Sequence, residues 1–299
     1  MLMQDVKDAI ILAGGMGTRM LPASLYMPKE TMPLVDTPIL NHLIWEASKA
    51  GVERIHLVLS ERKKKILDSF LESGRIFDSN IRTDLPSEAL ELGHSQVEII
   101  GHIQSEAGGV GDAIAVPLHI IEGPFLVLLG DNLLIKNHIG IKESGVEYAS
   151  EASLDLVNKY RETGLSIVGV NSVPKEDLDK YGVVEFSEKN RVSKIVEKPD
   201  IEDSPSNYVL SGRYVLPRNS NELIKSFPLS EYGELQSIAL LNHLAENEGL
   251  DYVKFDNYRL YDSGNPISWL KSQIDHSLLR EDIGEEIREW LNDRLNDSP

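Results

Sequence analysis

Short apolar runs alternate with amphipathic stretches along the first half of the chain, and this alternation restricts the fold more than any other feature. Between residues 39 and 50, apolar side chains recur at helical spacing, and Gly51 ends the segment. Strands that alternate with helices form parallel β-α-β units, whose helices cover both faces of the sheet. The sequence therefore predicts an α/β fold with a central sheet between two helical layers.

The second half of the chain has a different pattern, because strand-like segments dominate it. The expected strands are residues 10–13, 55–59, 96–103, 125–129, 166–170, 182–186, 192–196 and 211–216, and the expected helices are residues 39–50, 62–71 and 113–121. The polar stretch 77–93 contains Pro86 and is expected to be an insertion or a mobile loop. We find no low-complexity linker and no internal repeat, so we expect one domain with a mixed sheet.

The charge balance excludes several classes of partner. The 299 residues include 48 acidic and 30 basic side chains, and the formal net charge is −18. Nucleic acids and anionic membranes would be repelled, so neither is an expected partner. Cysteine is absent, which excludes disulfides, thiolate metal sites and cysteine nucleophiles. No apolar run approaches the roughly 20 residues of a membrane span, and we see no signal peptide, so a cytoplasmic protein is expected.

A glycine-rich, basic turn follows the first predicted strand. Residues 13–19 are Ala-Gly-Gly-Met-Gly-Thr-Arg, and Lys29 follows ten residues after Arg19. Glycines let the backbone approach a ligand and direct its N–H groups inward, which suits a polyphosphate. No lysine follows Gly17 as in a P-loop, and Met20 stands where the dinucleotide fingerprint needs its third glycine. We expect a different polyphosphate site here; a tight strand-to-helix turn is the alternative.

Two aspartates follow apolar segments and precede turns. Asp131 comes after Gly130 at the end of a predicted strand, and Asp262 precedes Ser263 and Gly264. Ligands of such sheets lie outside the carboxyl ends of the strands, so the glycine turn and Asp131 could share one crevice. If the two aspartates faced each other, they could share one Mg²⁺ ion, which prefers oxygen ligands. Each is otherwise an ordinary turn or capping residue.

Two further segments have side chains suited to substrate binding. Glu197 and Lys198 end a predicted strand before Pro199, and they could bind a hydroxyl group and a phosphate. A solvated strand end is the alternative. Gln104 precedes a glycine-rich segment at residues 108–111, and its amide suits the edge of a nucleobase. A flexible hinge would have the same composition.

In this order, the motifs resemble those of the sugar-1-phosphate nucleotidylyltransferases over about residues 7–270. The matching segments are residues 12–19, 28–34, 129–132, 181–184, 196–199, 206–207 and 261–264. The resemblance implies a Rossmann-like nucleotide-diphospho-sugar transferase fold with a mixed, mainly parallel sheet and a β-rich sugar-binding half. It also implies the family's reaction, in which a nucleoside triphosphate and a sugar 1-phosphate give a nucleotide-sugar and pyrophosphate.

The resemblance assigns a role to each candidate residue. The implied catalytic residues are Arg19, Lys29, Asp131 and Lys198. The implied nucleotide contacts are Ala13, Gly14, Gly15, Gly17, Thr18, Gln104 and Gly109. The implied sugar contacts are Tyr181, Gly182, Glu197 and Asn207, while Asp131 and Asp262 would hold the Mg²⁺ cofactor. Such a reaction needs no general base, because the attacking phosphate oxygen is already ionised and positive charges need only hold two anions in line.

The subfamily signals conflict. Segments 21–23, 204–207 and 212–216 resemble uridylyltransferases that use UTP and glucose 1-phosphate, which we expect to be the substrates. Segments 13–15, 129–132 and 233–235 look more like glucose-1-phosphate thymidylyltransferases, so dTTP is the alternative. A ring methyl in an apolar pocket discriminates by only about 1–3 kcal/mol. A regulatory protein that senses nucleotide-sugars without turnover is an alternative of another class.

The C-terminal tail differs from the rest of the chain. We expect a single domain over residues 1–275, with a nucleotide-binding half at about 1–135 and a sugar-binding half at about 136–275. In the tail, residues 276–299, apolar side chains recur every four positions from Ile283 to Leu295. This spacing predicts an amphipathic helix that either packs on its own domain or contacts a second subunit. The family resemblance implies a homodimer or homotetramer.

Overall fold

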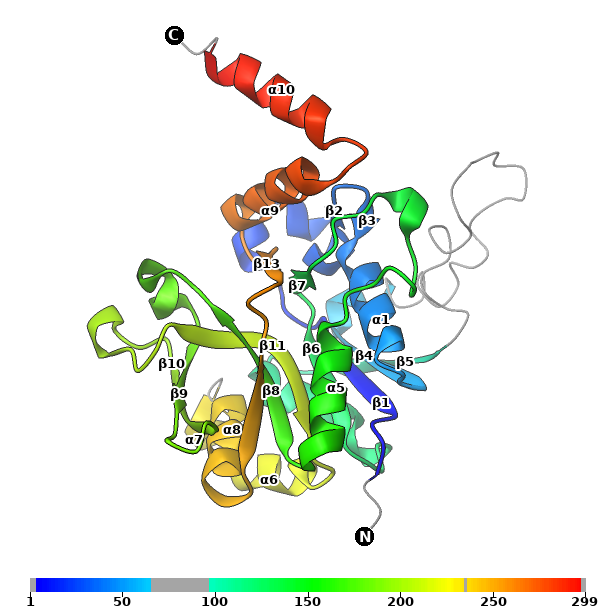
Figure 1. Cartoon of the computed structure of the whole chain (residues 1–299). Coiled ribbons are helices and arrows are strands. Elements are labelled where there is room, and N and C mark those ends of the chain that lie inside the picture. Colours follow the sequence, from blue (N-terminus) through cyan, green and yellow to red (C-terminus); the bar gives the residue numbers. More distant parts are fainter. Residues whose placement is uncertain (1–3, 66–96, 234–235, 297–299) are drawn as a thin grey trace.

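The structure is a computed structural model, and it describes residues 4–65, 97–233 and 236–296 (Figure 1). None of the helices within these ranges is long and apolar enough to cross a membrane. The predicted helix at 62–71 lies mostly outside the described residues, and the predicted loop at 77–93 lies wholly outside them. The subfamily segment 233–235 is described only at Gly233.

In the described part of the chain, nine strands form one mixed sheet. The strands are β1 (Asp8–Leu12), β4 (Arg54–Ser60), β5 (Glu98–Gln104), β6 (Phe125–Leu129), β8 (Ser166–Ser172), β9 (Gly182–Phe186), β10 (Val192–Glu197), β11 (Tyr208–Leu216) and β12 (Leu250–Lys254). Their order is β5-β4-β1-β6-β11-β8-β12-β10-β9. Of these nine described strands, seven share one direction, and β10 and β11 run the opposite way. The mixed, mainly parallel sheet is therefore confirmed.

Helices cover both faces of the sheet, as the alternating pattern predicts. The helices are α1 (Ile39–Lys49), α4 (Gly109–Ala115), α5 (Ala152–Thr163), α6 (Ser220–Ser226), α7 (Leu229–Tyr232), α8 (Gln236–Asn247), α9 (Pro266–Leu279) and α10 (Gly284–Asn296). Ala9 and Ile11 of β1 face the core under α1 and α5, whereas Ile10 and Leu12 face the core under α4, α6 and α8. Side chains alternate between the faces of a strand, so a strand covered on both sides is apolar throughout.

The helix predicted at 113–121 is shorter and begins earlier in the structure. Helix α4 ends at Ala115, and a 3₁₀ helix, η6 (Val116–His119), follows it. Pro117 explains the early end, because proline lacks the N–H group that would continue the ladder and its ring clashes with the preceding turn. Helix α4 begins at Gly109, where a φ of 83° changes the direction of the chain.

Two short ribbons lie beside the main sheet. They are β7 (Asn132–Ile135) with β13 (Arg259–Asp262), and β2 (Pro33–Leu34) with β3 (Thr37–Pro38). In the antiparallel β7–β13 ribbon, Asp262 pairs with Asn132, the neighbour of Asp131 in the chain. Ser263 extends this register, and its backbone N–H donates to the Asp131 carbonyl at 2.9 Å. The ribbon therefore brings the second aspartate segment to the carboxyl end of β6.

The C-terminal helices extend away from the sheet, and α10 packs chiefly against α9 (Figure 1). The predicted tail contains the helix α10, in which Ile287 and Leu291 are partly buried and two other large apolar side chains are exposed. Trp290 is 54% exposed and Leu295 is 73% exposed. The proposed boundary after residue 275 falls inside α9. The two expected halves, residues 1–135 and 136–275, both contribute strands to the same sheet.

Candidate active site

Lys29 and Asp131, which are 102 positions apart, form an ion pair at the carboxyl edge of the sheet. The Lys29 Nζ atom lies 2.5 Å from Asp131 Oδ2. Lys29 is buried in a 3₁₀ helix, η3 (Lys29–Thr31), and Asp131 lies in the turn between β6 and β7. Burial alone would raise the pKa of Asp131, but the charges of Lys29 and Arg19 lower it below its ordinary value. The carboxylate is therefore ionised at neutral pH.

Arg19 and Asp262 lie close together beside Gly264. Arg19 belongs to a 3₁₀ helix, η1 (Thr18–Met20), directly after the glycine turn. A Cβ atom on Gly264 would lie 2.8 Å from Asp262 Oδ1 and 3.0 Å from Arg19 Nη2, so both side chains flank this glycine. Burial and the charge of Asp262 raise the pKa of Tyr181, and Arg19 opposes the shift.

The glycine turn connects this cluster to Gln104. A Cβ atom on Gly14 would come within 2.9 Å of Gln104 Oε1, and one on Gly15 would lie 3.7 Å from Lys29 Nζ. Gly17 has a φ of 65°, in the left-handed region that favours glycine, and its carbonyl accepts a hydrogen bond from Ser24 Oγ at 2.8 Å. The turn thus depends on glycine for both close approach and backbone conformation.

Lys63, which the sequence analysis did not identify, is hydrogen-bonded to the backbone of the glycine turn. Its Nζ atom donates to the Ala13 carbonyl and to Glu30 Oε2, both at 2.7 Å, and both side chains are buried. Burial lowers the pKa of Lys63 and raises the pKa of Glu30. Glu30 stands in the motif around Lys29, but no local pattern in the sequence identifies the lysine that pairs with it.

Gln104 and Gly109, the residues expected to bind the nucleobase, are hydrogen-bonded to each other, and the segment between them contributes to a nearby hollow. Gln104 ends β5, and its Nε2 atom donates to Asp112 Oδ2 at 2.6 Å and to the Gly109 carbonyl at 3.3 Å. Asp112, a residue that the motif search missed, therefore orients the amide. A hollow of about 540 Å³ is lined by Glu106, Ala107, Gly108, Leu229 and Gly233. Its volume is within the usual range of small-molecule sites.

The expected sugar contacts meet where β9 begins and β10 ends. Glu197 pairs with Gly182 in the register of these strands, and the Lys198 N–H donates to the Tyr181 carbonyl at 3.0 Å. Lys198 Nζ lies 3.3 Å from Glu197 Oε1. Burial raises the pKa of Tyr214, and the charges of Glu197 and Asp131 add to that shift. Tyr214 is therefore a common neighbour of the sugar half and the Asp131 turn.

Asn207 stands apart from the other expected sugar contacts. Its side chain is exposed and donates to Ser172 Oγ at 2.9 Å. In the pairing of β11 with β9, Val209 lies opposite Val183, so the strand pairing places Asn207 beyond Val183 rather than beside Gly182. Among the described residues, no contact joins Asn207 to Glu197 or Lys198.

The two aspartates are the residues that could hold a metal ion. In the ranges that the structure describes, no cluster of three or more His, Cys, Asp or Glu side chains could hold one. A cation here would thus take at most two protein carboxylates. This donor set fits Mg²⁺, which usually binds one or two carboxylates and completes its octahedron with water and substrate phosphates.

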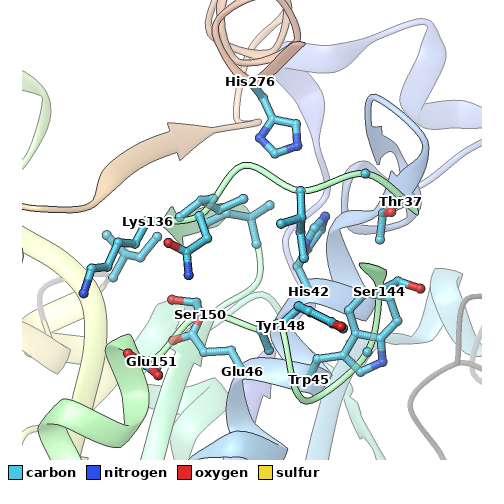
Figure 2. A pocket seen from close by; sticks show the side chains of 18 residues that line it. Thr37, His42, Trp45, Glu46, Lys136, Ser144, Tyr148, Ser150, Glu151 and His276 are labelled. Carbon is cyan, nitrogen blue, oxygen red and sulfur yellow. The ribbon is translucent and has the colours of Figure 1, made fainter. Parts of the chain in front are cut away.

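A separate small cavity lies between α1 and the segment after β7 (Figure 2). Its volume is about 40 Å³, and Trp45, Tyr148 and His276 are among its lining residues. None of the expected site residues lines it. The buried atoms His42 Nε2 and Ser144 Oγ have no hydrogen-bond partner in the described part of the chain. A cavity of this size has room for ordered water beside them.

Comparison with known proteins gives a consistent result. Residues 8–276 match the family model described as nucleotidyl transferase. The chain is 33% identical over 294 residues to UTP–glucose-1-phosphate uridylyltransferase 1 of Staphylococcus saprophyticus, and the alignment covers 96% of this chain and 98% of that protein.

Solved structures are similar over nearly the whole chain. A UDP-glucose pyrophosphorylase from Acinetobacter baumannii has a TM-score of 0.77 at 26% identity, covering 96% of this chain and 99% of that one. A UDP-glucose pyrophosphorylase complexed with UDP-glucose has a TM-score of 0.74 at 26% identity, covering 91% of this chain and 98% of that one. The expected nucleotide-diphospho-sugar transferase fold is therefore confirmed.

Proposed function

The chain belongs to the nucleotidyl transferase family, and we propose that it transfers the uridylyl group of UTP to glucose 1-phosphate, giving UDP-glucose and pyrophosphate. The choice of UTP and glucose 1-phosphate is supported by the name of the S. saprophyticus relative and by the UDP-glucose in a similar structure. One observation carries the proposal: Lys29 and Asp131 form an ion pair at the same edge where Arg19 and Asp262 flank Gly264.

The residues divide between the two substrates. The glycine turn, from Ala13 through Gly14, Gly15 and Gly17 to Thr18, binds the triphosphate with its backbone N–H groups. Arg19 and Lys29 neutralise the phosphates, and Gln104 with the Gly109 backbone contacts the uracil. Lys198 binds the phosphate of the sugar, and the hydroxyl groups of glucose contact Tyr181, Gly182 and Glu197. Asn207, whose side chain is exposed, is a further sugar contact in this proposal.

Positioning and charge account for the reaction. The attacking oxygen of glucose 1-phosphate is ionised near neutral pH, so no side chain has to remove a proton. Two unit charges about 4 Å apart repel by about 1 kcal/mol in water and more strongly in a drier site. Arg19, Lys29 and Lys198 offset this repulsion and hold the two phosphates in line.

Asp131 and Asp262 hold Mg²⁺ in this proposal. Bound there, Mg²⁺ would supply positive charge against the α-phosphate. Asp131 is suited to this role because the charges around it keep its pKa low, so its carboxylate is ionised. Lys29 is paired with that carboxylate, and in this proposal it contacts the same phosphate.

A substrate panel tests the proposal. Pyrophosphate release is measured for UTP, dTTP, ATP, CTP and GTP, each with glucose 1-phosphate and with other sugar 1-phosphates. We expect the highest kcat/KM for UTP with glucose 1-phosphate. A strong preference for dTTP would instead identify a thymidylyltransferase, and binding of UTP without pyrophosphate release would identify a regulatory protein that senses nucleotide-sugars.

We also propose that the protein is a cytoplasmic homodimer or homotetramer. The absence of cysteine from the sequence supports a reducing compartment. The exposed side chains of Trp290 and Leu295 support a subunit contact through α10, because large exposed apolar groups favour burial against a partner.

A further inference from the structure

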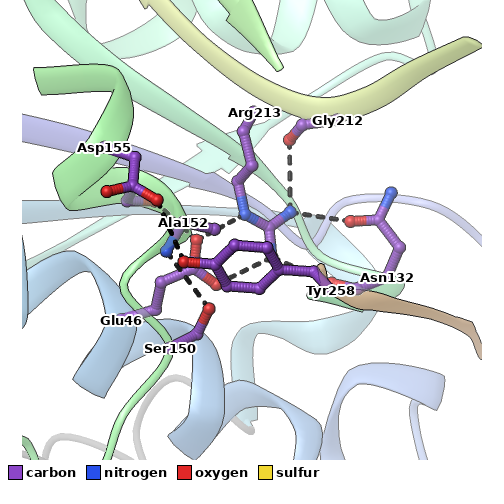
Figure 3. Close-up of polar contacts among 9 residues, drawn as sticks. Glu46, Asn132, Ser150, Ala152, Asp155, Gly212, Arg213 and Tyr258 are labelled. Carbon is purple, nitrogen blue, oxygen red and sulfur yellow. Dashed lines mark hydrogen bonds and ion pairs between the residues drawn. The ribbon is translucent and has the colours of Figure 1, made fainter. Parts of the chain in front are cut away.

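The buried ion pair between Arg213 and Glu46 is hydrogen-bonded to Asn132, the residue after Asp131 (Figure 3). We propose that Arg213, fixed by Glu46, is a positioning residue that sets the orientation of Asp131 through its contacts with Asn132. The inference rests on the proposed function, since it concerns the residues that would hold the metal and the α-phosphate. It gives a role to Arg213, which the sequence analysis quoted within segment 212–216 without assigning it one, and it adds Glu46 of α1.

One edge of the Arg213 guanidinium binds Glu46 with two hydrogen bonds. Its Nε atom donates to Glu46 Oε1 at 2.7 Å, and Nη2 donates to Glu46 Oε2 at 3.0 Å. Ser153 Oγ, from α5, also donates to Glu46 Oε1 at 2.6 Å. Arg213 is 0% exposed and Glu46 is 1% exposed. Because each partner is held by directional bonds away from water, the guanidinium has one orientation.

The other edge of the guanidinium binds Asn132, the residue after Asp131. Nη1 donates to Asn132 Oδ1 at 2.7 Å, and Nη2 donates to the Asn132 carbonyl at 3.2 Å. The backbone N–H and the Oγ of Ser263 both donate to the Asp131 carbonyl, each at 2.9 Å. Both sides of the turn are thus fixed, one by Arg213 and the other by the segment that carries Asp262.

An irregularity in β11 directs the Arg213 side chain toward Glu46 and Asn132. The register of β11 against β8 shifts between Leu210 and Tyr214, and Gly212 within this irregularity has a φ of 73°. A Cβ atom on Gly212 would lie 2.6 Å from Asn132 Nδ2, so only glycine allows the strand to approach the turn this closely. Irregularities of this kind re-aim a side chain, and they are common beside active sites.

Stability alone does not account for such a pair. Removing two charges from water is costly, and apolar residues of similar volume often stabilise a core as well as a buried ion pair does. An apolar pair cannot, however, hold the side chain and the carbonyl of Asn132. The distinct contribution of Arg213 is therefore geometric, and it acts on the turn between β6 and β7.

The double variant Glu46→Met/Arg213→Met separates positioning from stability. We expect its Tm to lie within a few degrees of the wild-type value, because no buried charge is left unpaired. We expect kcat to fall at least tenfold and the Mg²⁺ concentration for half-maximal rate to rise, with KM for glucose 1-phosphate nearly unchanged. Arg213→Lys keeps the charge but cannot contact Glu46 and Asn132 together, so kcat should fall in that variant too.

Arg280→Met is the matched control. Arg280 is also buried, but it pairs with Asp36 and Asp282, between α9 and α10. This variant should lower Tm and leave kcat and the Mg²⁺ dependence unchanged. A stable double variant with wild-type kcat and Mg²⁺ dependence would overturn the inference while leaving the proposed function intact.

Two further measurements cover other outcomes. If the double variant does not fold, Asn132→Ala removes only the side-chain contact with Arg213, and a wild-type kcat and Mg²⁺ dependence in that variant would equally overturn the inference. Calorimetric titration with UTP, with and without Mg²⁺, provides a readout besides turnover; we expect the gain in affinity from Mg²⁺ to shrink in the stable variants. A wild-type chain that neither turns over nor binds UTP overturns the proposed function, and this inference with it.

Discussion

Replacing Lys29 with methionine removes the positive charge that faces Asp131 and preserves most of the volume of the side chain. In the structure, Lys29 Nζ lies 2.5 Å from Asp131 Oδ2, and only 11% of the side chain is exposed. Solvent therefore screens this charge poorly. The variant should leave the Asp131 carboxylate without its nearest cation, so that it repels the phosphates it is proposed to bind.

The expected loss can be estimated from these positions. A unit charge about 4 Å from a phosphate oxygen contributes about 4 kcal/mol at an effective dielectric constant of ~20, which suits a partly buried site. Removal of one preorganised donor from an active site typically lowers kcat by about 10²–10³-fold, which corresponds to about 3–4 kcal/mol. We therefore expect kcat for Lys29→Met to fall by about 10²–10³-fold, with a smaller change in KM for UTP.

Steady-state pyrophosphate release measures both constants, and urea unfolding shows whether the variant is folded. Lys175→Met is the control, because Lys175 is exposed and its ion pair with Glu202 lies at the surface. It makes the same change in net charge away from the site. If Lys29→Met is folded and its kcat stays within threefold of wild type, the proposed role of this ion pair is wrong.

Three other changes have expected outcomes. Gly14→Ala places a Cβ atom 2.9 Å from Gln104 Oε1, so KM for UTP should rise about tenfold by steady-state kinetics; Gly123→Ala, whose nearest neighbour would lie at 3.7 Å, should leave it unchanged. Burial lowers the pKa of His42 to about 4, from 6.5. Between these values the unfolded chain binds more protons, so the free energy of unfolding falls by up to about 1.4 kcal/mol for each unit by which the pH is lowered. His42→Phe should reduce that slope by the share of one histidine in urea titrations at pH 7, 6 and 5, since burial also lowers the pKa of His102 and His276; an unchanged slope would contradict this expectation. Deleting residues 281–299 should reduce the mass measured by light scattering to that of a smaller oligomer or a monomer; a full-length chain that is already monomeric excludes α10 as a subunit contact.

Local pattern predicted most of the fold and the members of the charged cluster. The strands, the glycine turn and the amphipathic tail depend on side-chain spacing and glycine conformation, which are properties of neighbouring residues. The bounds predicted for the helix at 113–121 were wrong at both ends. The prediction followed the apolar residues and did not allow for Pro117, which comes after α4 has ended. For Asn207, the motif carried no information about the pairing of β11 with β9, which places the residue beside Ser172.

What only the tertiary structure decided is which distant charges meet. Arg213 joins Glu46 to Asn132 because β11 lies next to β6 in the sheet, and Lys63, just after β4, pairs with Glu30. Arg213 and Asn132 are 81 positions apart, and no periodicity links residues at that separation. By itself, the chain's sequence determined an α/β core and a basic, glycine-lined turn, since both follow from short-range sterics and hydrophobic spacing. Strand order and register, which depend on the packing of the whole sheet, determined how that turn and the aspartates are held together.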